Sequence, residues 1–288
     1  MHENRPMAVA EELENPSLLD STIFAFDVET TGLDPIEDRI VQLGGVFHNS
    51  GARLGPRKSS LINPGVPIPP EVTEIHGITD AMVAGAESFA AVGLRFVDDL
   101  RQGPDCEEPV LCGYNAPAFD VPFINAELNR HGIEHRIDPT RVLDPLVFVR
   151  WHHRGWRVRN LEAAARRCGF VIERAHSAAD DAEAALHVLW SLLEAGLVPL
   201  RAEDAFTAQR RLGDLLEEEW RRFGHALYLD RVDGRPRVGF GAHCGVLLAD
   251  IDREYLRWCL GEMGDLTDEA RALIEEAAKR RSEKRGAP

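Results

Sequence analysis

The chain has 288 residues and a mass of 32.0 kDa, with 44% hydrophobic and 28% charged residues. This composition supports a sizeable core and excludes disordered, collagen-like and coiled-coil chains. The 33 basic and 48 acidic residues give a formal charge of −15, which disfavours nucleic-acid binding through overall charge alone. Residues 21–199 carry −9 of this charge, whereas residues 200–288 carry only −2.

Targeting signals are not visible in the sequence. The first residues show no basic stretch followed by an apolar one, and no apolar run reaches the roughly 18–20 residues that cross a bilayer. The five cysteines form no C-x-x-C pair, which indicates reduced side chains and argues against a zinc cluster. We therefore predict a cytoplasmic protein without membrane contact.

Strand-like and helical segments alternate along most of the chain. Residues 22–26 are β-branched or aromatic and predict a strand, and residues 40–47 and 59–62 predict two more strands in an antiparallel meander. Apolar residues at helical spacing follow Ser88, and residues 110–114 predict a short buried strand. Further helices are predicted at residues 121–130, 144–151, 161–168 and 178–193. The interleaving indicates an α/β fold.

The pattern changes near residues 198–200. An amphipathic helix is predicted at residues 204–223, followed by a hairpin that turns at Asp233-Gly234. Two last helices are predicted near residues 253–263 and 268–281. We therefore predict three parts, which are a loose N-terminal arm (1–20), an α/β domain (21–199) and a small accessory module (200–288).

Carboxylates occur at three separate places in the α/β domain. Asp27 and Glu29 end the first predicted strand and share a face, because side chains two residues apart in a strand point the same way. The two carboxylates repel each other unless a cation neutralises them. A solvated strand end is an equal alternative interpretation. Asp120 and Asp181 lie at predicted helix starts, where capping or dipole roles are the simpler interpretation of each alone. His176 precedes the second of these helices closely enough to fold back toward Asp181.

Together, three motifs resemble the DEDDh branch of the 3′→5′ exonucleases over residues 21–196. The motifs are Asp-x-Glu-Thr-Thr-Gly at 27–32, Asn-x-x-x-Phe-Asp at 115–120 and His-x-x-x-x-Asp at 176–181. The third spacing selects the histidine branch of that family over the tyrosine branch. The resemblance implies a ribonuclease H-like α/β fold, with a mixed five-stranded sheet that has an antiparallel edge and is flanked by helices.

The resemblance also implies a centre of two Mg²⁺ or Mn²⁺ ions, since carboxylate oxygens suit these hard cations. Asp27 would be shared by both ions. Glu29 and Asp181 would complete the shell of one ion, and Asp120 would hold the other. His176 would be the general base, because an imidazole titrates near the working pH.

Recognition of the 3′ terminus follows from the same resemblance. Thr30, Thr31 and Leu33 would contact the terminal nucleotide, with the leucine as an apolar wedge. His76 would lie near that nucleotide, with a hydrogen-bonded loop histidine as the alternative. Asn115 would either hydrogen-bond near the site or serve a turn.

Two further segments bear on nucleic-acid binding. Residues 150–159 contain four arginines, two tryptophans and no acids, which suits a single strand through phosphate pairing and base stacking. A solvated loop whose tryptophans cover the core is an equal alternative. Residues 240–245 and 255–258 resemble the small domain of exodeoxyribonuclease X-like proteins, but Ala242 and Cys244 stand where that domain usually has basic residues.

These features predict a metal-dependent 3′→5′ exonuclease that releases 5′-mononucleotides from a single-stranded or frayed 3′ end of DNA. One alternative is a 3′ exoribonuclease on the same scaffold, because no residue reports on a 2′-hydroxyl. Another is a binding or proofreading subunit of a polymerase assembly. The sequence leaves a homodimer or a polymerase partner open.

Overall fold

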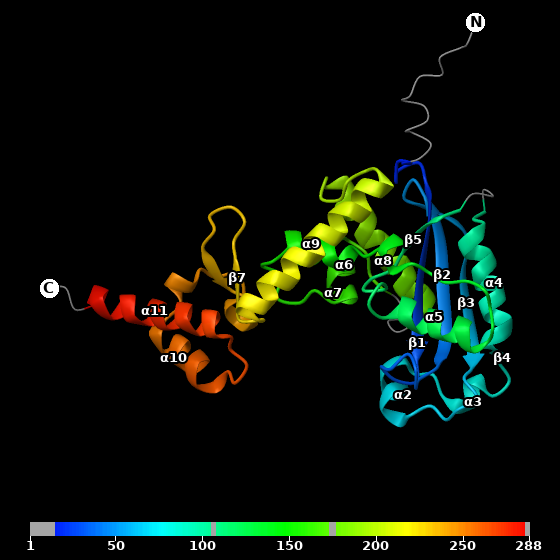
Figure 1. Ribbon diagram of the computed structural model, residues 1–288, viewed down its shortest axis with the longest axis horizontal. Coiled ribbons are helices and arrows are strands. Elements are labelled where there is room, and N and C mark those ends of the chain that lie inside the picture. The colour runs from blue at the N-terminus through cyan, green and yellow to red at the C-terminus, as the bar shows by residue number, and fades with distance from the viewer. Residues whose placement is uncertain (1–14, 105–107, 173–176, 286–288) are drawn as a thin grey trace, which may run out of the picture. The chain divides into compact units, whose positions relative to one another are not determined.

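The computed structural model describes residues 15–104, 108–172 and 177–285 of the chain, and Figure 1 shows their secondary structure. The chain divides into two compact units. Unit 1 is Met1–Phe148 with Asn160–Arg210, and unit 2 is Val149–Arg159 with Arg211–Pro288. The units therefore divide the chain differently from the boundary predicted at residue 199, because an arginine-rich segment of the predicted exonuclease domain joins unit 2.

Unit 1 is built on a mixed sheet, which in the described part of the chain has the strand order β4-β3-β2-β1-β5-β6. The strands are β1 (Thr22–Thr30), β2 (Ile40–Asn49), β3 (Ala52–Asn63), β4 (Glu87–Ser88), β5 (Val110–Cys112) and β6 (Val142–Leu143). Strands β1, β2 and β3 pair antiparallel, whereas the β1–β5, β5–β6 and β3–β4 pairs are parallel. The expected mixed α/β sheet is confirmed, and the two-residue strand β4 adds a sixth strand to the five expected.

Strands β1 and β3 differ in how deeply their side chains are buried, and this difference decides how well the sequence predicts their bounds. Strand β1 is buried on both faces from Thr22 to Phe26, as expected of a central strand with helices on either side. Strand β3 begins at Ala52 rather than at the predicted Ser59. Its first seven residues are mostly exposed and include three charged residues, a glycine and a proline, so they lack the apolar alternation that marks a strand in a sequence.

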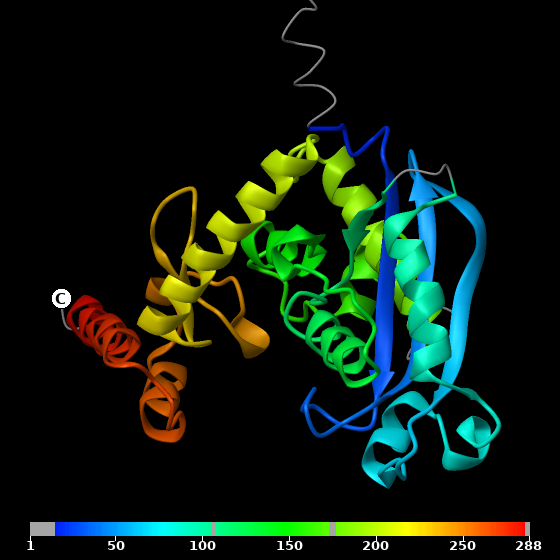
Figure 2. The same cartoon turned by 45° about the vertical axis from the view of Figure 1, so that its right-hand side comes forward.

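Helices cover the two faces of the sheet (Figures 1 and 2). Helices α4 and α5 supply the apolar side chains that pack on Phe24, Phe26 and Leu43. Helix α8 packs on β1 and β2 and contributes many alanines, whose small side chains allow a close approach. The helices of unit 1 are α2 (Pro70–His76), α3 (Asp80–Val83), α4 (Phe89–Arg101), α5 (Asp120–Arg130), α7 (Leu161–Arg167) and α8 (Ala178–Glu194), with a 3-10 turn at Pro139–Arg141.

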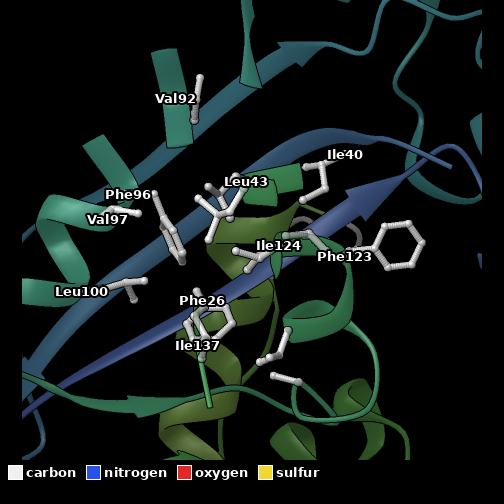
Figure 3. Packing of buried hydrophobic residues seen from close by; sticks show 14 of the residues in the cluster. Phe26, Ile40, Leu43, Val92, Phe96, Val97, Leu100, Phe123, Ile124 and Ile137 are labelled. Carbon is white, nitrogen blue, oxygen red and sulfur yellow. The ribbon is translucent and has the colours of Figure 1, made fainter. Parts of the chain in front are cut away.

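The core of unit 1 lies between the sheet and helices α4 and α5. Figure 3 shows Phe96 of α4 and Ile124 of α5 beside Leu43 of β2. Phe26 meets Phe96 edge to face with ring centroids 5.6 Å apart. This packing fixes β1, the strand that carries the paired carboxylates, from the side opposite to them.

Unit 2 has a separate small core. It is formed by apolar residues of three helices and a hairpin, among them Phe223, Leu256 and Ile274. Its elements are β7 (Leu227–Leu229), β8 (Pro236–Val238), α10 (Arg253–Glu262) and α11 (Asp268–Arg285), with 3-10 turns at Gly241–His243 and Leu248–Asp250. Helices α6 (Pro145–His152) and α9 (Ala202–Phe223) begin in unit 1 and end in unit 2.

Two expectations about the environment of the chain can be compared with the described residues. Within the ranges described, no helix combines the length and the apolar character that a membrane span requires. The four described cysteines are free thiols, and Cys106 lies outside the described residues. The cytoplasmic location stays a prediction.

Candidate active site

The first part of the site is the carboxyl end of β1. Asp27 and Glu29 are half-buried on one face of this strand, as their spacing predicts. Val28 between them points to the other face and is 4% exposed in the core. Because the core holds Val28, the orientation of both carboxylates is fixed by the strand rather than by a loop.

Helix α8 lies against β1 and β2 at the point where the two carboxylates emerge. Asp27 pairs across the sheet with Gly44, and Glu29 pairs with Gln42. A β-carbon on Gly44 would lie 2.2 Å from the backbone nitrogen of Ala179, so only glycine permits this approach. The Gln42 side chain accepts a hydrogen bond of 3.0 Å from the Ala178 N–H at the helix start. These contacts place the first turn of α8 over the strand.

The consequence is a compact group of carboxylates from distant parts of the chain. Oxygen atoms of Asp27, Glu29 and Asp181 all lie within 4.8 Å of one another, and all three residues are half-buried. The predicted convergence of Asp181 on the first strand is therefore present in the structure.

Asp120, the first residue of α5, reaches the same region from the side of β1 that pairs with β5. Strand β5 ends at Cys112, opposite Ala25, so it leaves the Val28 N–H without a strand partner on that side. The Asp120 carboxylate accepts this N–H at 2.8 Å and is 3% exposed. Asp120 is the first residue of α5 and not its N-cap, which is Phe119. The capping alternative for Asp120 is therefore wrong, because its side chain turns to the sheet.

The carboxylates raise one another's pKa. Burial raises the pKa of Asp27 well above its usual range, and the negative charges of Asp120 and Asp181 add to this. Burial followed by the charge of Asp181 raises the pKa of Glu29 to about 8. Burial also raises the pKa of Asp120 to about 7, although the Val28 N–H opposes the shift.

This donor set fits divalent metal ions. In the described part of the chain, the side chains whose charges raise these three pKa values are all carboxylates, and no lysine or arginine offsets them. A concentration of buried negative charge with oxygen donors only is the environment that Mg²⁺ or Mn²⁺ stabilises. A divalent-metal site at this end of β1 follows from the chemistry of the residues.

A further layer of ion pairs holds α8 on the sheet, and the sequence analysis did not identify it. Asp180, beside Asp181, is 3% exposed and forms an ion pair with Arg57 of β3. Arg57 also pairs with Glu183, which is bonded to Arg53 at 3.1 Å. The adjacent glycines at 44 and 45 within a predicted strand were the signal for the close helix, since strand glycines often mark such contacts.

The two predicted histidines differ in what the structure describes. His176 lies outside the described residues. His76 lies at the end of α2. Its Nδ1 accepts a hydrogen bond of 3.0 Å from the Ile78 N–H, and its Nε2 lies 3.3 Å from the Thr30 carbonyl oxygen. His76 is thus hydrogen-bonded to the residue that follows Glu29, as the alternative of a hydrogen-bonded loop histidine expects, and its contact with a terminal nucleotide stays a prediction.

The remaining predicted contacts lie in loops. Thr31 is buried and hydrogen-bonds with Asp38 at 3.1 Å, which shapes the loop after β1. Leu33 in that loop is 84% exposed, so its apolar side chain is available to a ligand. Asn115 has a φ of 65°, and its N–H donates to Asp144 at 2.8 Å, which shows that it forms a turn.

Comparison with known proteins identifies the family. Residues 24–189, more than half of the chain, match the family model described as exonuclease, RNase T type. The chain belongs to the RNase T exonuclease family. The resemblance found in the sequence is thereby confirmed, and the carboxylate cluster lies inside the matched range.

Curated relatives carry polymerase names. The chain is 34% identical over 172 residues to the DNA polymerase III subunit epsilon of Treponema pallidum, covering 59% of this chain and 75% of that one. It is 32% identical over 177 residues to the PolC-type DNA polymerase III of Listeria welshimeri. That match covers 62% of this chain and spans only 12% of the relative's length.

Solved structures share the fold at low sequence identity. Exonuclease I of E. coli bound to a dT13 oligonucleotide has a TM-score of 0.52 and 20% identity, covering 91% of this chain and 68% of that chain. The product-bound structure of exonuclease I has a TM-score of 0.51, covering 69% of this chain and 46% of that one. At this identity the likeness supports the fold alone.

Proposed function

We propose that this chain is a divalent-metal-dependent 3′→5′ exonuclease that acts on DNA and releases 5′-mononucleotides. The observation that carries the proposal is the convergence of Asp27, Glu29 and Asp181 within 4.8 Å, with Asp120 bonded to the same strand. The first and last of these residues are more than 150 positions apart in the sequence, so their meeting is a property of the fold. The matched exonuclease family adds support.

The four carboxylates would hold two Mg²⁺ or Mn²⁺ ions. Asp27 is central among them, because Asp120, Asp181 and Glu29 all act on its pKa, and we assign it as the ligand shared by both ions. Glu29 and Asp181 would complete one shell and Asp120 the other. Such ions stabilise the attacking and leaving oxygens of an in-line displacement at phosphorus. The protein's part is to hold the carboxylates rigidly on β1, α5 and α8.

His176 is assigned as the general base that takes the proton of the attacking water. Its place in the sequence, two residues before α8 begins, supports the assignment, because Asp181 lies in the first turn of that helix. The Arg57–Asp180 ion pair and the Gln42–Ala178 hydrogen bond would position both residues by fixing the start of α8.

The 3′ terminal nucleotide would lie between the loop after β1 and the end of α2. The exposed side chain of Leu33 supports a role as an apolar wedge against a base. Backbone groups of Thr30 and Thr31 would contact the sugar and phosphate, since the hydroxyls of both residues bond within the loop. His76 would orient Thr30 through its carbonyl. Asn115 would act through the turn that carries Asp120.

The names of the curated relatives, DNA polymerase III subunit epsilon and PolC-type DNA polymerase III, support DNA over RNA as the substrate. A second candidate function is proofreading within a polymerase assembly. It is favoured by the relatives named as DNA polymerase III subunit epsilon and as PolC-type DNA polymerase III. A polymerase partner and a homodimer both stay proposals.

The test is a degradation assay with 5′-labelled oligonucleotides. DNA and RNA of one sequence, each single-stranded and duplex, are incubated with Mg²⁺, with Mn²⁺ or with EDTA. We expect a ladder that shortens from the 3′ end of single-stranded DNA and stops in EDTA. A single internal cut would exclude an exonuclease, and faster loss of RNA would assign the exoribonuclease alternative.

A further inference from the structure

Unit 2 contains a group of arginines that the proposed catalysis does not use. We call Arg150, Arg154, Arg157, Arg159 and Arg231 the arginine cluster. The guanidinium groups of Arg154 and Arg231 lie over the ring of Trp151, at 5.2 and 3.7 Å from its centroid. Arg159 donates a hydrogen bond of 3.3 Å to the Arg154 carbonyl. Two segments of unit 2, residues 149–159 and the β7–β8 hairpin, are thereby brought together.

The positive charge of this cluster is poorly balanced. Arg154 and Arg231 share one carboxylate, that of Glu219. Arg154 is only 7% exposed, and its Nε and Nη2 have no hydrogen-bond partner in the described part of the chain. Burial lowers the pKa of Arg159, and the charges of Arg150 and Arg154 lower it further. Buried cations that repel one another are stabilised by an added anion.

The exposed members of the cluster can reach such an anion. The side chains of Arg150 and Arg157 face solvent, and that of Arg231 is 39% exposed. Neither Arg150 nor Arg157 forms an ion pair within the described ranges, and residues 150–159 contain no acid. Guanidinium groups form paired hydrogen bonds with phosphate, and several in a row suit a chain of phosphates rather than a single ion.

Flat aromatic side chains lie among these arginines. Trp156 stacks on His153 with ring centroids 4.0 Å apart and an angle of 8° between the rings, and both side chains are half-buried. Trp151 is also half-buried beneath Arg231. Aromatic faces between cations are the combination that binds unpaired bases together with their phosphates. An acidic peptide would use the cations but would have no planar group to stack on the aromatic side chains.

Unit 2 also differs in overall charge from the rest of the chain. Its two segments, residues 149–159 and 211–288, contain 18 basic and 16 acidic residues and carry +2, whereas unit 1 carries −17. A polyanionic strand therefore meets a net repulsive charge on unit 1 and an attractive one on unit 2.

We propose that the arginine cluster of unit 2 is a binding surface for the phosphate backbone of single-stranded nucleic acid. The choice of nucleic acid over other polyanions rests on the proposed function. The surface would hold the strand through contacts that do not depend on the carboxylate cluster, and it would supply the basic groups that unit 1 lacks.

The test is an equilibrium binding measurement without turnover. Full-length protein carrying Asp27→Asn, in EDTA, is titrated into fluorescein-labelled (dT)20 at several salt concentrations. Arg150→Gln/Arg157→Gln is compared with the matched double variant Arg253→Gln/Arg257→Gln, whose arginines are exposed on α10. We expect the first variant to raise Kd at least about fivefold and to lower the salt slope by about 1.4, since each phosphate contact on a single strand contributes about 0.7. The control should change both values much less.

Two outcomes would overturn the proposal. One is an equal rise of Kd in both double variants, which would mean that only overall charge matters. The other is equally tight binding of poly-glutamate that is lost with the same variant, which would assign the surface to acidic peptides. Neither result depends on catalysis, so a protein that failed the degradation assay would still decide this point, and an active exonuclease could still fail here.

Discussion

The carboxylate cluster of unit 1 and the arginine cluster of unit 2 are both collections of like charge, but the chain builds them differently. The carboxylates are fixed on regular elements, β1, α5 and α8, and the described residues that act on the pKa values of Asp27, Glu29 and Asp120 include no cation. The arginines lie at the end of helix α6, on the loop that follows it and on a hairpin, and Glu219 and aromatic rings partly balance their charge. The first cluster is therefore shaped for compact cations at fixed positions, whereas the second suits an extended, adaptable anion.

The largest effect is expected when one negative charge is removed from the carboxylate cluster. Asp27→Asn should lower kcat at least about a thousandfold, which corresponds to roughly 4 kcal/mol of transition-state stabilisation. In EDTA at pH 8 the same variant should unfold at a higher temperature than the wild type, because it relieves repulsion with Asp120 and Asp181. The exposed Asp98→Asn on α4 is the charge-matched control for both measurements. An active Asp27→Asn protein would contradict the site assignment.

A second prediction concerns the approach of α8 to the sheet. Gly44→Ala adds a methyl group within 2.2 Å of the Ala179 nitrogen, so the start of the helix must move and take Asp181 with it. We expect kcat to fall about a hundredfold, as displacements of about 1 Å in an active site can cause, with a higher Mg²⁺ concentration at half-maximal activity. Gly213→Ala in α9, where a β-carbon meets nothing within 4 Å, should leave activity unchanged. Equal activities of the two variants would show that α8 tolerates the change.

Removal of the carboxylate from the arginine cluster should destabilise the folded protein, whereas removal of one carboxylate from the carboxylate cluster should stabilise it in EDTA. Glu219→Gln leaves the buried Arg154 without its counter-charge, and we expect a loss of about 3 kcal/mol of unfolding free energy in urea titrations. The same variant should bind (dT)20 about threefold more tightly, because one repulsive charge is gone. Glu217→Gln on the same helix breaks only an exposed pair with Arg221 and should cost less than about 0.5 kcal/mol. Tighter binding by both variants to the same degree would point to net charge alone.

The smallest effect tests a buried group that belongs to neither cluster. Burial and the neighbouring His187 lower the pKa of His48 to about 4, and His48 is 2% exposed. Below about pH 6.5 the unfolded chain therefore binds a proton on His48, whereas His48 in the folded protein stays neutral down to about pH 4. The stability that the neutral His48 allows is fully present above pH 6.5, and the free energy of unfolding falls as the pH drops from 6.5 toward 4. Between pH 7 and pH 5 the wild type should lose about 2 kcal/mol more stability than His48→Leu. Parallel pH profiles of the two proteins would contradict the shift.

Much of the fold and the core of the site could be predicted because their signals are local. Alternation and β-branching located β1 and β2, and the spacing of Asp27 and Glu29 set their common face. The start of β3 was missed because its exposed residues show no alternation, and β6 is too short to give a pattern. The ion pair between Arg57 and Asp180 joins residues 123 positions apart, and no local pattern reports such a distance.

The sequence by itself determined the order of the longer strands and helices, the carboxylate motifs and the family, because these depend on residue types at short spacings. Tertiary structure alone decided that Asp120 binds the Val28 N–H, that Gly44 admits α8, and that residues 149–159 join unit 2. The physical reason is that each of these contacts is a choice among many distant partners. That choice is made by how the core packs and by which backbone groups it leaves unpaired, and neither is written in any single segment.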